Sequence, residues 1–363
     1  MKNKDTPIIG IIGGYSKVGI AAIDYLIMET NATLLIGGRN LSKGEKQASR
    51  FPDRITAVEV DIFDTPALNN FCQQCHIIIN LAGPTLKIMD RIALAALSNN
   101  CHYIDIGGYD LLLEALMSKS EEIKEKGLVF VVGAGWMPGV SGIFPKSVIE
   151  NSLKELDTIN TVKIYYGASE AWSYNSCMDL TWSLSLKSNG IFKQGKWQLV
   201  SPSKHTQKVF FPPLNKSKYT TPYFDNQLKL VAQDLEAPFF GNYVIINSKL
   251  SMLSSLFIKI FLHGNTRCAA KIMEKEARIS SRKGSWGLIY CVVEGMKNNL
   301  KKQITAYIYE NDNYKPTGTV SAIAANFVLQ NRIEKGLGYL CHKIDPHHFM
   351  SELKSQNIIA RYE

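Results

Sequence analysis

The feature that most restricts the fold of this chain is a short apolar strand that runs into a glycine-rich turn. Residues 8–12 are isoleucine or glycine, which is typical of a strand covered on both faces. The turn follows at once, and residues 18–28 then place apolar side chains at helical spacing. This order of strand, glycine turn and apolar helix predicts a βαβ unit whose helix N-terminus binds a diphosphate.

The residues of the turn have defined tasks in such a site. Its first glycines permit the tight turn, and Gly19 lets the helix approach the strand closely. Ser16 stands where a GxGxxG motif has its middle glycine; its hydroxyl can donate to a phosphate, although its side chain also takes up space there. The expected diphosphate-binding segment is Gly13, Gly14, Tyr15, Ser16, Lys17, Val18 and Gly19.

The end of the second expected strand, residues 33–36, predicts which cofactor binds. Gly38, Arg39 and Asn40 follow this strand, and Lys43 lies one helical turn later. An NAD site usually has a carboxylate here for the ribose 2′-hydroxyl, whereas a guanidinium can form paired hydrogen bonds with a 2′-phosphate. We therefore expect NADP(H) rather than NAD(H). The alternative is an arginine that is simply exposed after a strand.

The ends of the third and fourth strands supply further cofactor contacts. Asp61 and Ile62 follow the third strand, where a carboxylate can meet the adenine amino group. Leu81, Ala82 and Gly83 form a small-residue turn after the fourth strand, suited to backbone passing under the nicotinamide ribose. Suitable residues at several consecutive strand ends are more specific than the glycine motif alone.

The catalytic candidates follow the fifth strand. Reduction with a nicotinamide needs a proton source beside the hydride donor, and Asp105, Tyr109 and Asp110 are placed to supply it. Asp105 can instead be a structural cap at the strand end. The substrate-binding candidates, for which simple packing is the alternative, are Trp136, Met137, Glu170, Trp172 and Tyr174.

The pattern along the chain predicts an α/β protein with two domains. Residues 1–138 alternate six apolar strands with helices, which indicates a Rossmann-type doubly wound parallel sheet. Residues 139–316 contain strands separated by aromatic and turn residues, which favours a second α/β domain with a mainly antiparallel sheet for substrate binding or dimerisation. Helices in residues 317–363 are expected to return to the first domain.

Composition excludes several classes of protein. The chain has 363 residues and a net charge of +9, but its basic residues are dispersed, so we expect an anionic small ligand and no nucleic acid. Seven scattered cysteines do not suggest a disulfide framework and favour the cytoplasm, and no metal site is expected. No apolar run is long enough for a membrane span; residues 250–262 read as a buried or interface helix, with peripheral membrane contact as the alternative.

One further pattern is set aside. Tyr339-x-x-x-Lys343 matches the YxxxK of short-chain dehydrogenases, but it does not follow the fourth strand, and a chain with 16 tyrosines contains such a match by chance.

Taken together, these motifs resemble the saccharopine dehydrogenase-like family of NAD(P)-dependent oxidoreductases. In two places the sequence departs from the family pattern: Ser16 replaces a glycine, and Tyr109 stands where an acidic residue is common. The resemblance covers residues 10–142 and the C-terminal tail, and rests on Ile12–Gly19 for GGYGxVG, Gly38–Asn40, Asn80–Pro84, His102–Gly108 for HYxDxxG, Gly133–Gly139, Gly336–Gly338 and Asp345–Leu353.

The resemblance implies an NADP(H)-dependent reductase of an imine formed from an amine and a carbonyl compound, acting on a small molecule as a homodimer. Two alternatives stay open. One is a reductase of an enoyl or thioester-bound intermediate in natural-product biosynthesis, with a carrier protein as partner. The other is a dinucleotide-sensing protein without catalysis.

Overall fold

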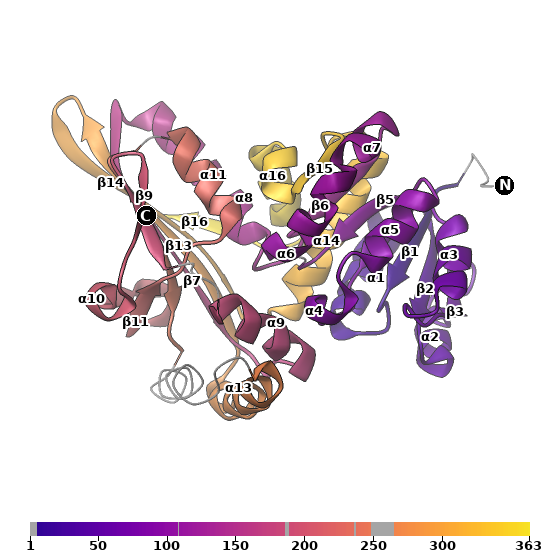
Figure 1. Ribbon diagram of the computed structural model, residues 1–363. Helices are drawn as coiled ribbons and strands as arrows, with labels where there is room; N and C mark the ends of the chain where they lie inside the picture. The colour runs from indigo at the N-terminus through magenta and orange to yellow at the C-terminus, as the bar shows by residue number, and fades with distance from the viewer. Residues whose placement is uncertain (1–5, 108, 186–188, 236, 248–264) are drawn as a thin grey trace. The chain divides into compact units, whose positions relative to one another are not determined.

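The computed structural model describes residues 6–107, 109–185, 189–235, 237–247 and 265–363 (Figure 1). The chain divides into two compact units, Met1–Ile143 with Tyr314–Gln356, and Phe144–Asn313 with Asn357–Glu363. The domain boundaries expected from the sequence, after residue 138 and before residue 317, and the roles assigned to the two domains remain predictions.

The first unit is built on a seven-stranded parallel sheet of order β15-β6-β5-β4-β1-β2-β3. All neighbours pair in parallel, so every strand has its carboxyl end at the same edge. The chain order reverses at β1, which is where open α/β sheets bind ligands. The strands are β1 (Ile8–Ile12), β2 (Thr33–Gly38), β3 (Ile55–Glu59), β4 (Ile77–Asn80), β5 (His102–Asp105), β6 (Val129–Val132) and β15 (Gly336–Tyr339).

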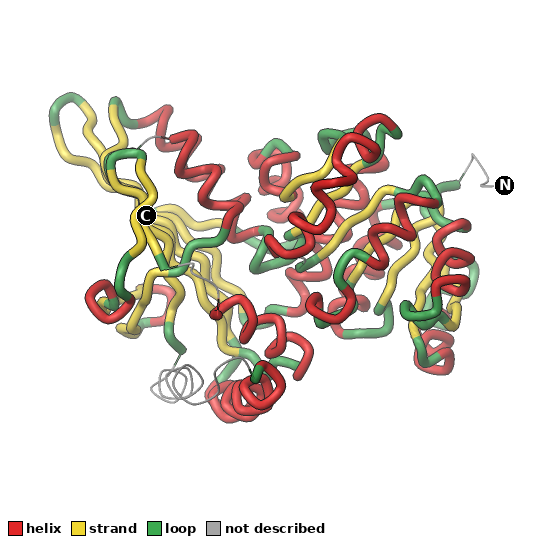
Figure 2. Tube along the Cα trace, viewed as in Figure 1, coloured by secondary structure: helices red, strands yellow, loops and turns green. Residues whose placement is uncertain are grey.

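The doubly wound sheet is thus confirmed, with one strand more than expected. The seventh strand, β15, comes from the C-terminal segment and pairs with β6. Helices lie among these strands (Figure 2), and they are α1 (Lys17–Glu29), α2 (Leu41–Ala48), α3 (Thr65–Gln73), α4 (Thr85–Ile88), α5 (Arg91–Ser98), α6 (Tyr109–Leu116), α7 (Ser120–Glu125), α14 (Tyr314–Leu329), α15 (Leu340–Lys343) and α16 (Pro346–Ser355).

Two pairs of neighbouring helices are separated by short breaks. Helices α4 and α5 are separated at Met89, which has a φ of 49° that no α-helix accommodates. Helices α6 and α7 are separated by the 3-10 turn Met117–Lys119. Short breaks of this kind leave the apolar spacing intact, so the sequence does not reveal them.

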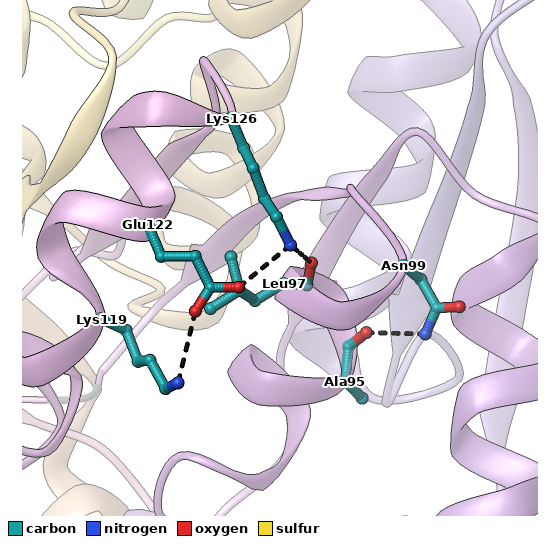
Figure 3. A network of polar contacts seen from close by, with 6 residues as sticks. All are labelled: Ala95, Leu97, Asn99, Lys119, Glu122 and Lys126. Carbon is teal, nitrogen blue, oxygen red and sulfur yellow. Dashed lines mark hydrogen bonds and ion pairs between the residues drawn. The ribbon is translucent and has the colours of Figure 1, made fainter.

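Helix α7 is attached to the end of α5 by one lysine (Figure 3). Lys126 Nζ donates to the carbonyl oxygen of Leu97 at 3.3 Å and pairs with Glu122 at 3.0 Å. Glu122 also pairs with Lys119 at 3.3 Å, and the two lysines hold the pKa of its carboxyl below the ordinary value. These groups are exposed, so this network orders the surface without a large effect on stability.

The C-terminal helix α14 packs closely on α1. A Cβ atom at Gly318 would overlap the backbone carbonyl oxygen of Val18, so only glycine permits this contact. On the same pair of helices, Asn326 Nδ2 donates to the Tyr25 hydroxyl at 3.1 Å, and that hydroxyl donates to Glu352 of α16 at 2.7 Å. The return of the chain to the first unit is therefore fixed by both shape and hydrogen bonds.

The second unit has a nine-stranded sheet in which only β7 and β12 pair in parallel. The expectation of a mainly antiparallel sheet is confirmed. Its strands are β7 (Thr158–Ser169), β8 (Gly190–Lys193), β9 (Lys196–Leu199), β10 (Gln207–Phe211), β11 (Lys216–Pro222), β12 (Phe239–Ile245), β13 (Trp286–Lys297), β14 (Leu300–Glu310) and β16 (Ala360–Tyr362). Its helices are α8 (Val140–Glu155), α9 (Tyr174–Ser185), α10 (Pro202–His205), α11 (Asn226–Leu235) and α13 (Thr266–Ser280).

A row of tyrosines crosses the centre of this second sheet. Tyr243, Tyr165, Tyr290 and Tyr307 lie opposite one another on four adjacent strands. Phe211 packs edge-on against Tyr165 and Tyr290. Burial raises the pKa of Tyr243 to about 12. The row is the core of the unit, since each ring is mostly enclosed.

All seven cysteines are free thiols, and six of them are buried. Cys101 Sγ contacts the carbonyl oxygens of Cys72 and Cys75, so the Cys72-x-x-Cys75 pair belongs to the packing of the first unit. In the part of the chain that is described, no cluster of side chains is suited to a metal ion, and no helix has both the length and the apolar character to cross a membrane. The helix expected over residues 250–262 lies outside the described residues.

At the contact between α1 and α14, replacing a helix glycine by alanine should lower the stability of the chain, which is the reverse of the usual effect. Alanine normally stabilises a helix interior by about 1 kcal/mol relative to glycine. Gly318→Ala should instead destabilise the chain by about 1–3 kcal/mol, because the added methyl group meets backbone that cannot move aside. Denaturant unfolding of the two proteins measures the difference, and a more stable Gly318→Ala protein would contradict the packing described.

Candidate functional site

The glycine turn is shaped by its own hydrogen bonds. Gly13 has a φ of +84°, a conformation that favours glycine, and its N–H donates to the carbonyl oxygen of Gly37 at 2.9 Å. Ser16 N–H donates back to the carbonyl oxygen of Gly13 at 3.0 Å. The chain therefore leaves β1 and enters α1 within a single turn.

Two other glycines let this turn lie close to the sheet and the helix. A Cβ atom at Gly19 would overlap the carbonyl oxygen of Gly14, and one at Gly14 would lie 2.7 Å from Cγ2 of Ile36. The first contact is with backbone, so it cannot be relieved by a side-chain rotation. Helix α1 consequently begins directly against the turn, with its N-terminus at the carboxyl edge of the sheet.

Ser16 is the N-cap of α1. Its Oγ accepts a hydrogen bond from Gly19 N–H at 3.0 Å. The first N–H groups of a helix have no partner within the helix, so those of Lys17 and Val18 are left to face a ligand. The first turn contains no acidic residue that would repel an anion. Because Ser16 Oγ only accepts in this cap, its own hydrogen can still be donated to a phosphate.

The end of β2 brings Tyr15 beside Gly38. A Cβ atom at Gly38 would lie 2.6 Å from the Tyr15 hydroxyl oxygen, so the glycine makes room for this ring. Asn40 caps α2 by accepting from Lys43 N–H at 2.9 Å, and the first turn of α2 has no acidic residue. Arg39 is exposed and has no ion-pair partner among the described residues. This surface is suited to an additional phosphate.

The other expected cofactor residues also follow strand ends of the first sheet. Asp61 is exposed after β3 and accepts from Phe63 N–H at 3.0 Å, while Ile62 is buried. After β4, Leu81 N–H donates to the carbonyl oxygen of Ile12, and Ala82 N–H donates to Asn80 Oδ1 at 3.0 Å. Gly83 completes this turn. The structure thus places these residues along one edge of a single unit.

Asp105 is enclosed by hydrogen-bond donors. Its carboxylate accepts from the Tyr103 hydroxyl at 2.6 Å, from Asn80 Nδ2 at 2.8 Å and from Gly107 N–H at 2.9 Å, and the residue is only 4% exposed. Burial raises the pKa of this carboxyl, although the three donors act in the opposite direction. This geometry favours the structural alternative, in which Asp105 joins β4, β5 and the loop that follows.

Asp110 has a different environment. It lies in the first turn of α6, is half-buried, and accepts a hydrogen bond from the Tyr339 hydroxyl at the end of β15. The side chain of Tyr109 lies outside the described residues. Lys343 donates to the carbonyl oxygen of Lys335 and not to this pair.

The substrate-binding candidates are divided between the units. In the first unit, Trp136 is 3% exposed, and its indole N–H has no acceptor among the described residues; Met137 next to it is half-buried. In the second unit, Glu170 directly follows β7 and is 9% exposed. Trp172 and Tyr174 pack against the buried cluster formed by α9 and α13. These two aromatic residues therefore contribute to the packing of the second unit.

Comparison with known proteins bears on this site. Residues 9–131 match the family model described as the saccharopine dehydrogenase NADP binding domain. Over 98% of its length the chain superposes on 99% of the apo histidine-tagged saccharopine dehydrogenase (L-Glu forming) from Saccharomyces cerevisiae, with a TM-score of 0.74 and 15% identity. The fold of the whole chain is therefore that of this enzyme.

Residues 9–131 are thus similar to the NADP-binding domain of saccharopine dehydrogenase, and the whole chain shares the fold of one such enzyme. These findings bear out the resemblance inferred from the motifs and support a nicotinamide dinucleotide-binding domain in the first unit.

Two curated proteins are also similar to this chain. A carboxyaminopropylagmatine dehydrogenase of Synechocystis is 19% identical over 381 aligned positions, which cover 94% of each chain. A lipid droplet localized protein of Caenorhabditis elegans is 26% identical over 161 positions, or 43% of this chain. That match spans about a third (36%) of the Caenorhabditis elegans protein.

Three residues of this candidate site were not predicted from the sequence. Tyr103 and Asn80 were placed in strands and turns without a partner, yet both donate to Asp105. Tyr339 was set aside as a chance match, yet β15 brings it to the carboxyl edge beside Asp110. A polar residue at the last position of a strand was the available signal for Asn80; no local signal pairs Tyr339 with a residue more than 200 positions earlier.

The environment of Asp105 predicts a pH-dependent stability. Because its pKa is raised above the ordinary 3.8, the folded chain retains a proton that the unfolded chain has already released. Relative to Asp105→Asn, wild-type stability should be greatest below about pH 4 and should decrease as pH rises through the raised pKa, by at most about 1.4 kcal/mol per pH unit. Unfolding midpoints of both proteins across the acid range measure this. A wild type that becomes more stable relative to Asp105→Asn as pH rises would contradict the raised pKa.

Proposed function

We propose that this chain is an NADP(H)-dependent reductase of C=N bonds formed from an amine and a carbonyl compound. The observation that carries the proposal is the pair of anion-binding features on one edge of the first sheet. These are the N-terminus of α1, where the N–H groups of Lys17 and Val18 face outward from the Ser16 cap, and the exposed Arg39 after β2.

The residues present fit a dinucleotide. Gly14 and Gly19 have no side chains that would block the close approach of a diphosphate, and the Ser16 hydroxyl can donate to it. Arg39 has the shape and charge for a ribose 2′-phosphate, with Tyr15 and Lys43 beside it. When bound, the nicotinamide supplies the hydride.

We assign to Asp110 the role of the general acid that protonates the imine. An imine accepts hydride far better when it is protonated, so a positioned acid increases the rate. Asp110 is the less enclosed of the two strand-end carboxyls, since Asp105 is fully engaged by internal donors. The Tyr339 hydroxyl orients the Asp110 carboxylate by donating to one of its oxygens. Tyr339 is therefore a positioning residue in this scheme.

Trp136 offers a donor to the substrate or to an ordered water. An indole N–H that is buried without an acceptor costs about 1–3 kcal/mol, so an acceptor supplied by a ligand would offset this cost. A carboxylate or a carbonyl oxygen has the required chemistry. Met137 supplies apolar surface beside it.

The names of the similar proteins support the substrate class. One is a saccharopine dehydrogenase (L-Glu forming), and the other is a dehydrogenase named for carboxyaminopropylagmatine. The second name describes an amino compound, in keeping with chemistry at a carbon–nitrogen bond. The chain aligns with this protein over 94% of both lengths.

Arg39→Ala tests the cofactor preference. Loss of the guanidinium should weaken NADPH binding about ten- to hundredfold, because a charge-assisted hydrogen bond contributes about 1.5–3 kcal/mol, and should leave NADH binding nearly unchanged. Nicotinamide fluorescence during titration measures both affinities. Arg50→Ala is a matched control, since Arg50 is an exposed arginine of the same unit that pairs with Asp24. Equal losses for NADPH and NADH would refute the assignment of Arg39.

Turnover tests the reaction itself. NADPH oxidation, followed by the loss of nicotinamide absorbance, should require both an amine such as agmatine or L-lysine and a 2-oxoacid or aldehyde. Oxidation by the carbonyl compound alone, or by an enoyl thioester, would contradict C=N reduction. Binding of NADPH without turnover of any such mixture would favour a dinucleotide sensor.

Asp110→Asn should reduce this turnover about 10²- to 10⁴-fold without weakening NADPH binding, as expected for loss of a general acid. In Tyr339→Phe the kcat of this turnover should fall while the KM for NADPH stays unchanged, because the carboxyl of Asp110 loses the donor that orients it. A Tyr339→Phe protein with reduced stability and an unchanged kcat would indicate a purely structural contact.

A further inference from the structure

Glu170 is a buried carboxylate held by three neutral donors. Its Oε1 accepts from the Ser285 hydroxyl at 3.0 Å and from Ala171 N–H at 3.2 Å, and its Oε2 accepts from Asn313 Nδ2 at 3.4 Å. The residue directly follows β7, and only 9% of its surface is exposed. All four residues belong to the second unit.

The other acidic groups of this unit that form ion pairs are far more exposed. Asp157 pairs with Lys297 at 2.9 Å and Glu155 pairs with Lys302 at 2.8 Å, with carboxylate side chains that are 49% and 55% exposed. Glu170, by contrast, has no ion-pair partner among the described residues. Burial of a charge is costly unless an opposite charge accompanies it. Glu170 is therefore a buried carboxyl group that neutral donors orient and that has no ion-pair partner among the described residues.

Lys218, a half-buried lysine of β11, has other partners. Lys218 lies over the Trp286 ring at 5.3 Å and donates to the carbonyl oxygen of Asn247. Trp286 is opposite Ser169 in the ladder, and successive side chains of a strand point to opposite faces. Ser169 and Trp286 thus share one face of the sheet, while Glu170 and Ser285 lie just beyond the two strands and contact each other. Lys218 does not provide the counter-charge.

We propose that Glu170 of the second unit is an ammonium-binding subsite, suited to a primary amine. The assignment rests on the proposed function, since that function requires an amine. A carboxylate has about four acceptor positions, and three are occupied, so one position remains on Oε2. A primary ammonium group has three donors on a compact charge, and at this position it would restore neutrality and complete the hydrogen bonding of the carboxylate.

Putrescine is the probe for this subsite, and butanediol, which has the same length and no charge, is its neutral counterpart. Binding of each to the full chain without cofactor is measured by calorimetry and by saturation-transfer NMR. Glu170→Gln should weaken putrescine binding about ten- to hundredfold, since it removes one charge-assisted hydrogen bond. Glu294→Gln is the matched control, because Glu294 is an exposed acid of the same unit that pairs with Lys163 at 3.9 Å; it should bind putrescine as wild type does.

A second variant and a stability measurement distinguish ligand binding by Glu170 from a purely structural role of this residue. Glu170→Asp keeps the charge and should retain more putrescine affinity than Glu170→Gln. Glu170→Gln should unfold at a temperature no lower than wild type, because it removes an uncompensated charge while keeping a side chain of the same shape. Added putrescine should raise the unfolding temperature of wild type but not of Glu170→Gln.

The outcomes separate this subsite from the proposed function. Equal putrescine affinity in wild type and Glu170→Gln, or a wild type that binds butanediol as well as putrescine or binds neither, overturns the subsite. NADPH binding should be unchanged in Glu170→Gln. If the chain binds no NADPH while its putrescine affinity still depends on Glu170, the proposed function fails and the ammonium subsite stands.

Discussion

The contact between the N-terminus of α1 and the turn that precedes it is the constraint on which the candidate site depends. At Gly19 the helix meets the backbone of Gly14 so closely that no side chain fits between them. This contact brings the first N–H groups of α1 to the carboxyl edge of the sheet. Capping by Ser16 then satisfies Gly19 N–H and leaves the preceding N–H groups for a ligand.

Three carboxylates show how the surroundings of one chemical group decide its role. Asp105 is buried among three donors within its own unit, so its charge serves to join neighbouring strands. Asp110 is half-buried and has a single phenol donor, which orients it while leaving it exposed to a reactant. Glu170 is buried among neutral donors and forms no ion pair with the described residues of its unit. The same side-chain chemistry is thus suited to structure, proton transfer and recognition of a cation.

The part of the fold that the sequence predicts well is the part built from local signals. Apolar strands such as Ile77–Asn80 and the glycine turn after Ile8–Ile12 are recognisable because each is covered on both faces or requires a special backbone conformation. The seventh strand, Gly336–Tyr339, has two glycines in four residues and pairs with a strand some 200 residues earlier, so it gives no such signal. In the second unit, the strand Lys216–Pro222 contains several polar residues and is held by its pairing with β10 and β12, so its local sequence signal is weak as well.

In the candidate site, too, the residues fixed by local sequence signals could be predicted and those fixed by distant strand pairing could not. The positions of Arg39 and Ser16 could be predicted because they are fixed by sequence distance from a strand. The donors of Asp105 and the Tyr339–Asp110 pair could not, because the register between strands decides them. What the sequence lacks is the identity of the neighbour across the sheet, and that neighbour determines whether a carboxylate is enclosed or exposed.

A crystal structure of the complete chain with NADPH tests the central claim most directly. The account predicts the diphosphate within hydrogen-bond distance of the N–H groups of Lys17 and Val18 and of the Ser16 hydroxyl, with the 2′-phosphate against Arg39. A nucleotide bound elsewhere, or a diphosphate that does not contact the start of α1, would contradict it.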